Sequence, residues 1–201
     1  MKKIMFMAMM MTIAISAQAM PYNTAREEAL FLSDKMAYEL NLTDAQYEAV
    51  YEINLDYFLN MNTQNDLFGP WWEVRNRDLR LVLGAWQYDR YMSSRYFYRP
   101  LVWRAGIWNL GIYDRYQRHQ MFHRHPVAFH NFRGGHSHRG TSFYHRHHFA
   151  VPSAPAGGRA PSARPNHNHH PGAPGRPGHT PGRGHGGHGG HGGHGGHGGR
   201  R

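Results

Sequence analysis

The sequence contains no cysteine, and it contains no acidic residue after Asp114. The first absence excludes disulfide bonds, thiolate metal ligands and a cysteine for lipid attachment. The second leaves the C-terminal part without carboxylates that could ligate a metal or neutralise arginines. After Ile15 there is no further long apolar run, so we expect no membrane-spanning helix in the mature chain.

The N-terminus has the pattern of a secretory signal. Met1-Lys2-Lys3 is followed by an apolar run to Ile15 and by the sequence Ala-Gln-Ala at residues 17–19. A basic start, a short apolar segment and small residues at the cleavage site are typical of a Sec signal peptide. We therefore expect residues 1–19 to be removed after Ala19, and the mature chain to be periplasmic or otherwise exported.

Charge is divided unevenly along the chain. Residues 20–70 carry nine acids and two basic residues, residues 71–114 have a net charge of +3, and residues 115–201 hold twelve arginines. All 18 histidines also lie beyond Asp114. An acidic head with a basic tail predicts self-contact, self-assembly or a polyanionic partner, and anionic envelope polymers would suit an exported protein.

Apolar spacing predicts four helices, at about residues 25–39, 44–67, 70–83 and 85–98. Between the first two, Asn41 can adopt the left-handed conformation that ends a helix, and Thr43 with Gln46 can form a capping box that begins the next. We expect an all-α fold, with residues 20–99 forming a small helical hairpin or bundle. Because about 75 residues make a marginal core, we also expect a homodimer.

Two faces of these helices attract attention. The first is an aromatic face that comprises Tyr57, Phe58, Trp72 and Trp86. We predict that it binds client proteins; the alternative is that these side chains belong to the core. The second is the acidic row Glu48, Glu52 and Asp56, spaced by four residues. We interpret this row as a solvated face; the alternative is a surface that docks arginine from the protein's own tail or from a partner.

Residues 100–150 alternate aromatic side chains with arginine and histidine. Short strands are predicted at residues 101–103, 108–113 and 127–132, and the segment could lie as an apron over the helices. Interleaved arginines and aromatics also suit single-stranded nucleic acid, but export argues against that partner. Cell-surface polyanions fit the same chemistry.

Residues 151–201 are rich in proline, glycine and histidine, and their composition predicts disorder. Imidazole suits zinc, copper and nickel, and glycine spacers would let several rings converge on one ion. We expect that no metal is required for the fold. The alternatives to a metal-binding tail are a tail that only adds solubility and a tail that responds to pH. The candidate metal ligands are His167, His169, His170, His179, His185, His188, His191, His194 and His197.

Motifs for catalysis are missing. The sequence has no nucleophile elbow, no phosphate-binding loop and no HExxH pattern, and its acids are spread over helix faces. We therefore expect a non-enzymatic protein.

Residues 42–46, with Leu42, Thr43 and Gln46, match the LTxxQ motif, and Leu83 with Gln87 forms a looser second copy. In this the chain resembles the Spy/CpxP-like family of periplasmic proteins. That resemblance implies a small helical, often dimeric body that binds unfolded or envelope proteins as a chaperone or stress sensor. A zinc-associated branch, typified by ZraP, adds metal-binding histidines. The later part of the chain resembles aromatic, arginine-rich secreted proteins of Bacteroidetes.

Three hypotheses follow from these patterns. The first is a Spy/CpxP-like chaperone or envelope-stress protein whose tail responds to metal. The second is a metal-sequestering protein in which the helices only carry the histidines. The third is a structural, envelope-associated protein whose basic tail binds anionic polymers.

Overall fold

The computed structural model describes residues 19–155, and this part of the chain is mostly helical, as expected. Residues 1–18 of the predicted signal peptide (residues 1–19) and all nine candidate metal ligands lie outside the described residues. None of the helices in residues 19–155 combines the length and the apolar character needed to cross a membrane.

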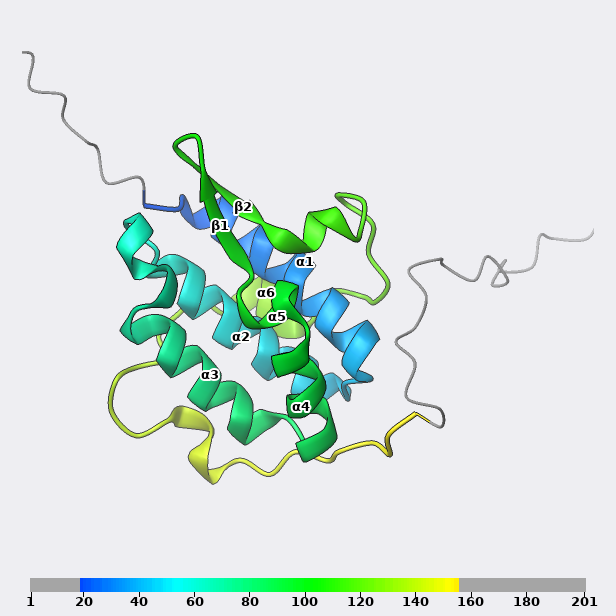
Figure 1. Cartoon of the computed structure of the whole chain (residues 1–201). Coiled ribbons are helices and arrows are strands. Elements are labelled where there is room, and N and C mark those ends of the chain that lie inside the picture. The colour runs from blue at the N-terminus through cyan, green and yellow to red at the C-terminus, as the bar shows by residue number, and fades with distance from the viewer. Residues whose placement is uncertain (1–18, 156–201) are drawn as a thin grey trace, which may run out of the picture. The chain divides into compact units, whose positions relative to one another are not determined.

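A helical hairpin forms the centre of this part (Figure 1). Helix α1 (Tyr22–Leu40) ends at Asn41, whose φ of 49° and ψ of 55° are the predicted left-handed conformation. Helix α2 (Asp44–Leu59) begins with the predicted capping box, because the Thr43 side chain accepts from the Gln46 amide and Gln46 accepts from the Thr43 amide. The helix stops eight residues earlier than expected. Asp66 accepts hydrogen bonds from the amides of Asn62 and Thr63, which builds a 3-10 turn at Gln64–Phe68 instead.

The second half of the helical region packs against this hairpin. Helix α3 (Pro70–Val82) begins at the predicted proline. The predicted fourth helix is divided into α4 (Ala85–Ser93) and α5 (Arg95–Tyr98), because Ser94 has the extended angles φ −95° and ψ 97°.

One buried cation joins these helices. Arg75 on α3 is fully buried and donates to Asn54 Oδ1 at 2.8 Å, to the Tyr91 hydroxyl at 2.8 Å and to the carbonyl of Phe97 at 3.0 Å. It therefore connects α2, α4 and α5 through neutral acceptors. Removing this guanidinium would take a hydrogen-bond partner from each of its buried acceptors, so Arg75 is important for folding.

The segment after α5 begins with the two predicted strands. β1 (Leu101–Arg104) pairs antiparallel with β2 (Ile107–Leu110) through a two-residue turn, Ala105 and Gly106, in which both residues have positive φ. The strand predicted at residues 127–132 is wrong. These residues form the short helix α6 (Val127–Asn131), which begins after Pro126 and whose first amides are held by Glu48.

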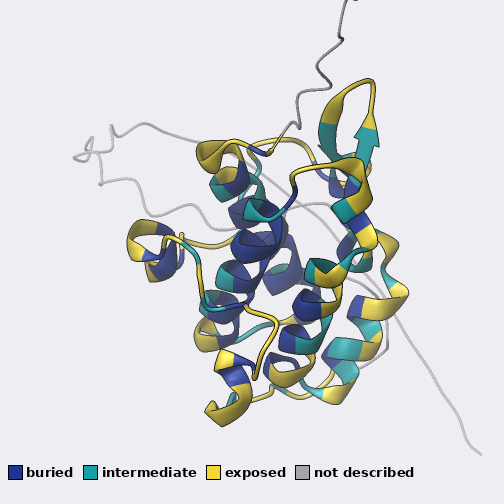
Figure 2. Cartoon of the chain, turned by 90° about the vertical axis from the view of Figure 1, so that its left-hand side faces the viewer, coloured by how far each residue is buried: buried dark blue, intermediate teal, exposed yellow. Residues whose placement is uncertain are grey.

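Residues 101–149 share one hydrophobic core with the helices rather than lying beside it. Figure 2 shows the central helices buried along most of their length, with exposed residues concentrated in the outer turns. The core residues contributed by this later segment are Leu101, Leu110, Ile112, Tyr116, Ala128, Phe129, Phe132 and Tyr144. The helical region therefore obtains its covering layer from its own chain.

Candidate binding surfaces

The two motif glutamines meet in the interior. Gln46 Nε2 donates to Gln87 Oε1 at 2.7 Å, and Gln87 Nε2 donates back to Gln46 Oε1 at 3.1 Å. Gln46 also donates to the Val82 carbonyl at the end of α3, and Gln87 donates to the Leu40 carbonyl at the end of α1. Both side chains are fully buried with their amide groups satisfied. The two motif copies thus form one paired joint between the α1–α2 and α3–α4 corners.

Gly84 takes the place of threonine in the second copy for a steric reason. A Cβ atom at residue 84 would lie 2.2 Å from Val151 Cγ1. Beside it, Trp86 Nε1 donates to the carbonyl of Pro152 at 2.9 Å. The end of the described chain therefore packs directly on the second motif.

The acidic row on α2 is not a solvated face, and that interpretation is wrong. Glu48 accepts from the amide of Ala128 at 2.6 Å, and Glu52 accepts from the Tyr144 hydroxyl at 2.9 Å. Asp56, which is 2% exposed, accepts from the amides of Gly135 and Ser137 at 2.6 Å. The row is a docking surface for the protein's own later segment, which presents mainly amides and hydroxyls rather than arginine.

Helix α1 anchors the same segment with further carboxylates. Buried Asp34 accepts from the amides of Phe122 and His123 and from Lys35 Nζ. Glu39 accepts from Arg115 Nε at 2.9 Å and from the Tyr116 hydroxyl at 2.7 Å. These bonds replace the regular backbone pairing that residues 113–144 largely lack.

The pKa values of these buried carboxyl groups are shifted in different directions, because burial raises each of them and the hydrogen bonds that they accept lower each of them. Burial alone would raise the pKa of Asp34, but the hydrogen bonds from His123 and Lys35 hold it below its ordinary value. For Asp56 burial prevails over two amide hydrogen bonds, so its pKa is raised. Burial likewise raises the pKa of Glu28, which accepts from the Tyr113 hydroxyl.

The predicted aromatic client surface is not present as such. Tyr57 and Phe58 are 1% and 0% exposed and belong to the core, so their assignment to a binding face is wrong. Burial is also why the pKa of Tyr57 is raised to about 12. Trp72 and Trp86 are half-buried, and their indole nitrogens already donate to the carbonyls of Tyr98 and Pro152.

Within residues 19–155, no three histidine or acidic side chains are grouped closely enough to hold a metal ion. Several histidines here serve packing instead. His136 stacks on Phe143 with ring centroids 3.9 Å apart, and its Nδ1 lies 2.8 Å from Glu52. The zinc, copper or nickel site predicted for the tail therefore has no counterpart among the described residues.

Arginines and carboxylates differ sharply in exposure. All 13 acids lie in the described part, and most of them face inward. The exposed acids are Glu27, Asp44, Glu73, Asp89 and Asp114. The exposed arginines are twice as many: Arg80, Arg95, Arg99, Arg104, Arg115, Arg118, Arg124, Arg133, Arg139 and Arg146. The surface of this part is therefore basic, because folding buries or half-buries most of the carboxylates and leaves more arginines than acids exposed.

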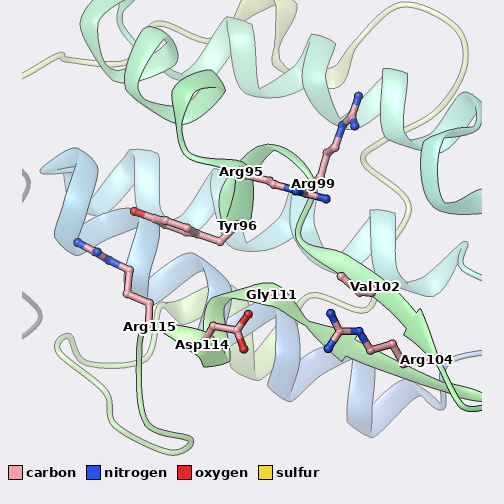
Figure 3. Close-up of a pocket in the computed structure, with 8 residues that line it drawn as sticks. All are labelled: Arg95, Tyr96, Arg99, Val102, Arg104, Gly111, Asp114 and Arg115. Carbon is pink, nitrogen blue, oxygen red and sulfur yellow. The ribbon is translucent and has the colours of Figure 1, made fainter.

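Four of these arginines are among the residues that line one cavity of about 480 Å³. Its lining comes from three places: α5 and the residue that follows it contribute Arg95, Tyr96 and Arg99; β1 contributes Val102 and Arg104; and the 3-10 turn after β2, with the next residue, contributes Gly111, Asp114 and Arg115. In Figure 3 the Arg99 side chain extends away from the turn that carries Asp114, on the far side from Arg104. Val102 and Arg104 share one face of the strand because side chains alternate along it. In Figure 3 Arg104 extends from β1 back toward the turn that carries Asp114.

Glu39 holds one wall of this cavity in place. Its buried carboxylate accepts from Arg115 Nε at 2.9 Å and from the Tyr96 hydroxyl at 2.8 Å. Arg115 is thereby neutralised. Among the described residues, no carboxylate lies within ion-pair distance of Arg95, Arg99 or Arg104.

Sequence reasoning did not single out these three arginines. The signal was present, since Arg95 and Arg99 stand four residues apart and Arg104 alternates with Val102. Their position around one cavity depends on how the β-hairpin and α5 pack together, which local spacing does not reveal.

No family model, no curated protein and no solved structure matches the chain.

Proposed function

We propose that this is an exported, non-enzymatic protein that binds anionic polymers of the cell envelope through its arginine-rich surface. The observation that carries the proposal is the inward orientation of the carboxylates, which leaves ten exposed arginines against five exposed acids in residues 19–155. Guanidinium groups form paired hydrogen bonds with carboxylates and phosphates, so a surface of this kind attracts acidic polymers.

Binding of this type has a clear test. The mature protein should be retained on immobilised polygalacturonate at low ionic strength and released as salt is raised, with no effect of a metal chelator. Retention that is unaffected by salt, or that is lost with chelator, would contradict the proposal.

A Spy/CpxP-like chaperone or stress protein is a second candidate, supported by the pairing of the two LTxxQ-like motifs. A four-helix hairpin body, a homodimer and clients among unfolded or envelope proteins belong to this proposal. The client surface would need residues other than Tyr57 and Phe58, because both are buried. The test is suppression of aggregation of a denatured client, with and without Zn²⁺ or Cu²⁺, by the mature protein.

A further inference from the structure

We infer that the arginine cavity between α5, β1 and residues 111–115 binds one acidic sugar unit, carrying a carboxylate or a phosphate ester. This inference rests on the proposed function and names the part of the polymer that is recognised. It concerns Arg95, Arg99 and Arg104, whose charges have no carboxylate partner among the described residues.

The cavity is organised before any ligand arrives. Tyr96 and Arg115 are both fixed on the buried carboxylate of Glu39. Arg99 lies over the ring of Phe68, 4.9 Å from its centroid, so its guanidinium is held at the rim of the cavity and would have to turn inward to contact a ligand. The Pro100 carbonyl accepts from the Gly111 amide at 2.8 Å and ties the strand to the opposite turn. Side chains that are already ordered lose less entropy when a ligand binds.

The lining chemistry favours a saccharide over a lipid surface. The cavity is concave and has the size of an ordinary small-ligand site, whereas a membrane would require a flat or protruding basic surface with exposed apolar groups. The half-buried ring of Tyr96 offers an apolar surface to a sugar ring, while its hydroxyl is held by Glu39. Asp114 also lines the cavity and opposes an anion, so it should weaken binding.

A polymer could continue beyond this site. Tyr96 also lines a second cavity, of about 500 Å³, together with Trp86, Arg90, Ala154 and Pro155. Glu39 and Asp89 line it too, and exposed Asp89 opposes an anion there. The sequence after Pro155 holds six more arginines, Arg159, Arg164, Arg176, Arg183, Arg200 and Arg201. One acidic unit in the arginine cavity would place the following units along Tyr96 and toward Ala154 and Pro155.

The experiment is calorimetric titration of the full mature protein with trigalacturonate, glucose 6-phosphate and neutral maltotriose at low ionic strength. We expect at least one acidic sugar to bind and maltotriose not to bind. Arg95→Gln, Arg99→Gln and Arg104→Gln combined should weaken that binding about tenfold, because charge-assisted hydrogen bonds are lost. The matched control, Arg124→Gln, Arg139→Gln and Arg146→Gln combined, removes equal charge from exposed residues and should change affinity less than about twofold.

Asp114→Asn provides an independent variant that removes no arginine, and it should tighten binding of the acidic sugar. Three outcomes would overturn the assignment of the cavity as the binding site. These are an equal loss of affinity in the two triple variants, no binding of either acidic sugar, and an unchanged affinity in Asp114→Asn. Tighter, cavity-dependent binding of single-stranded DNA would overturn the choice of a saccharide. If wild-type protein is retained on polygalacturonate and the two triple variants are retained equally, the cavity is wrong but the proposed function stands. If wild-type protein is not retained at all, the proposed function fails.

Discussion

At the scale of single residues, Gln46 and Gln87 show why the motif ends in glutamine. Each glutamine side chain accepts a hydrogen bond from the backbone amide at the start of its own helix. It also bonds to the other glutamine side chain and donates to the last carbonyl of a helix in the other motif's corner. Glutamate could not donate, and a shorter asparagine would not span these partners. The motif residue is therefore required by hydrogen-bond geometry at a buried joint.

Replacing either glutamine should leave buried groups without partners. Gln46→Ala and Gln87→Ala should each lower the free energy of unfolding by about 2 kcal/mol. The double variant should lose about 1 kcal/mol less than the sum, because the two side chains share two hydrogen bonds. Urea denaturation measures all three values, with exposed Gln117→Ala as the control. Strict additivity would show that the two glutamines act separately.

Asp34 should contribute stability that depends on pH. Asp34→Asn leaves buried Lys35 without its anionic partner and should cost about 3 kcal/mol at pH 7. Because the folded pKa of Asp34 is lowered, its contribution is present above the unfolded pKa of about 4 and is lost as pH falls through the folded value. Denaturation of the wild type and the variant should therefore be measured from pH 7 down to pH 3. The difference between their free energies of unfolding should narrow only in the acid range. Exposed Asp89→Asn is the matched control, and a gap that does not depend on pH would contradict this account.

At the scale of elements, the contact of residues 151–155 with the start of α4 explains a departure from the motif. Gly84 is needed because Val151 occupies the space of a side chain there. Gly84→Ser should lower the free energy of unfolding by about 1 kcal/mol through overpacking. In a Val151→Ala background the same serine should be neutral or gain a few tenths of a kcal/mol, because it can cap α4. Thermal unfolding of the four proteins checks this reversal, and destabilisation in both backgrounds would refute it.

Local signals predicted the helices well. Asn41, Thr43, Pro70 and Pro100 mark boundaries because each restricts or caps the backbone within a few residues. The strand expected at residues 127–132 became α6 because a distant carboxylate, Glu48, accepts from its first amides. Such long-range partners leave no trace in local spacing.

The binding surfaces were harder to foresee for the same reason. Acids spaced by four residues indicate a helix face, but they do not show what covers it. The inward bonds of Glu52 and Asp56, and the placing of Arg95 and Arg104 around one cavity, arise only when residues far apart in the chain pack together.

At the scale of the whole molecule, residues 101–149 enlarge the hydrophobic core of the helical region. A helical region of about 75 residues suggested a homodimer because its core would be marginal. Residues 101–149 supply core side chains from the same chain, so folding no longer requires a second copy for that reason. Dimerisation remains a prediction, which light scattering on the mature protein would measure.

Removing residues 156–201 separates the contributions of the tail sequence from those of the described part. The cut should follow Pro155, because ending at Ala150 would remove Val151 and Pro152, which contact Gly84 and Trp86. Thermal unfolding should be nearly unchanged, since the core residues all precede the cut. Stoichiometric binding of Zn²⁺, Cu²⁺ or Ni²⁺ should be lost with the nine tail histidines, because residues 19–155 hold no cluster suited to a metal.

The same truncated protein tests how the cavity and the tail sequence cooperate. Its affinity for trigalacturonate should match that of the mature protein, because a short ligand needs only the cavity. Its affinity for long polygalacturonate should fall by about tenfold or more, because a polymer held at two places gains from the high effective concentration of the second site. Titrations of both ligands against both proteins measure this. Equal affinity of the two proteins for the long polymer would mean that the described surface alone binds it, and metal uptake retained after the cut would assign the metal ligands to the histidines between residues 119 and 148.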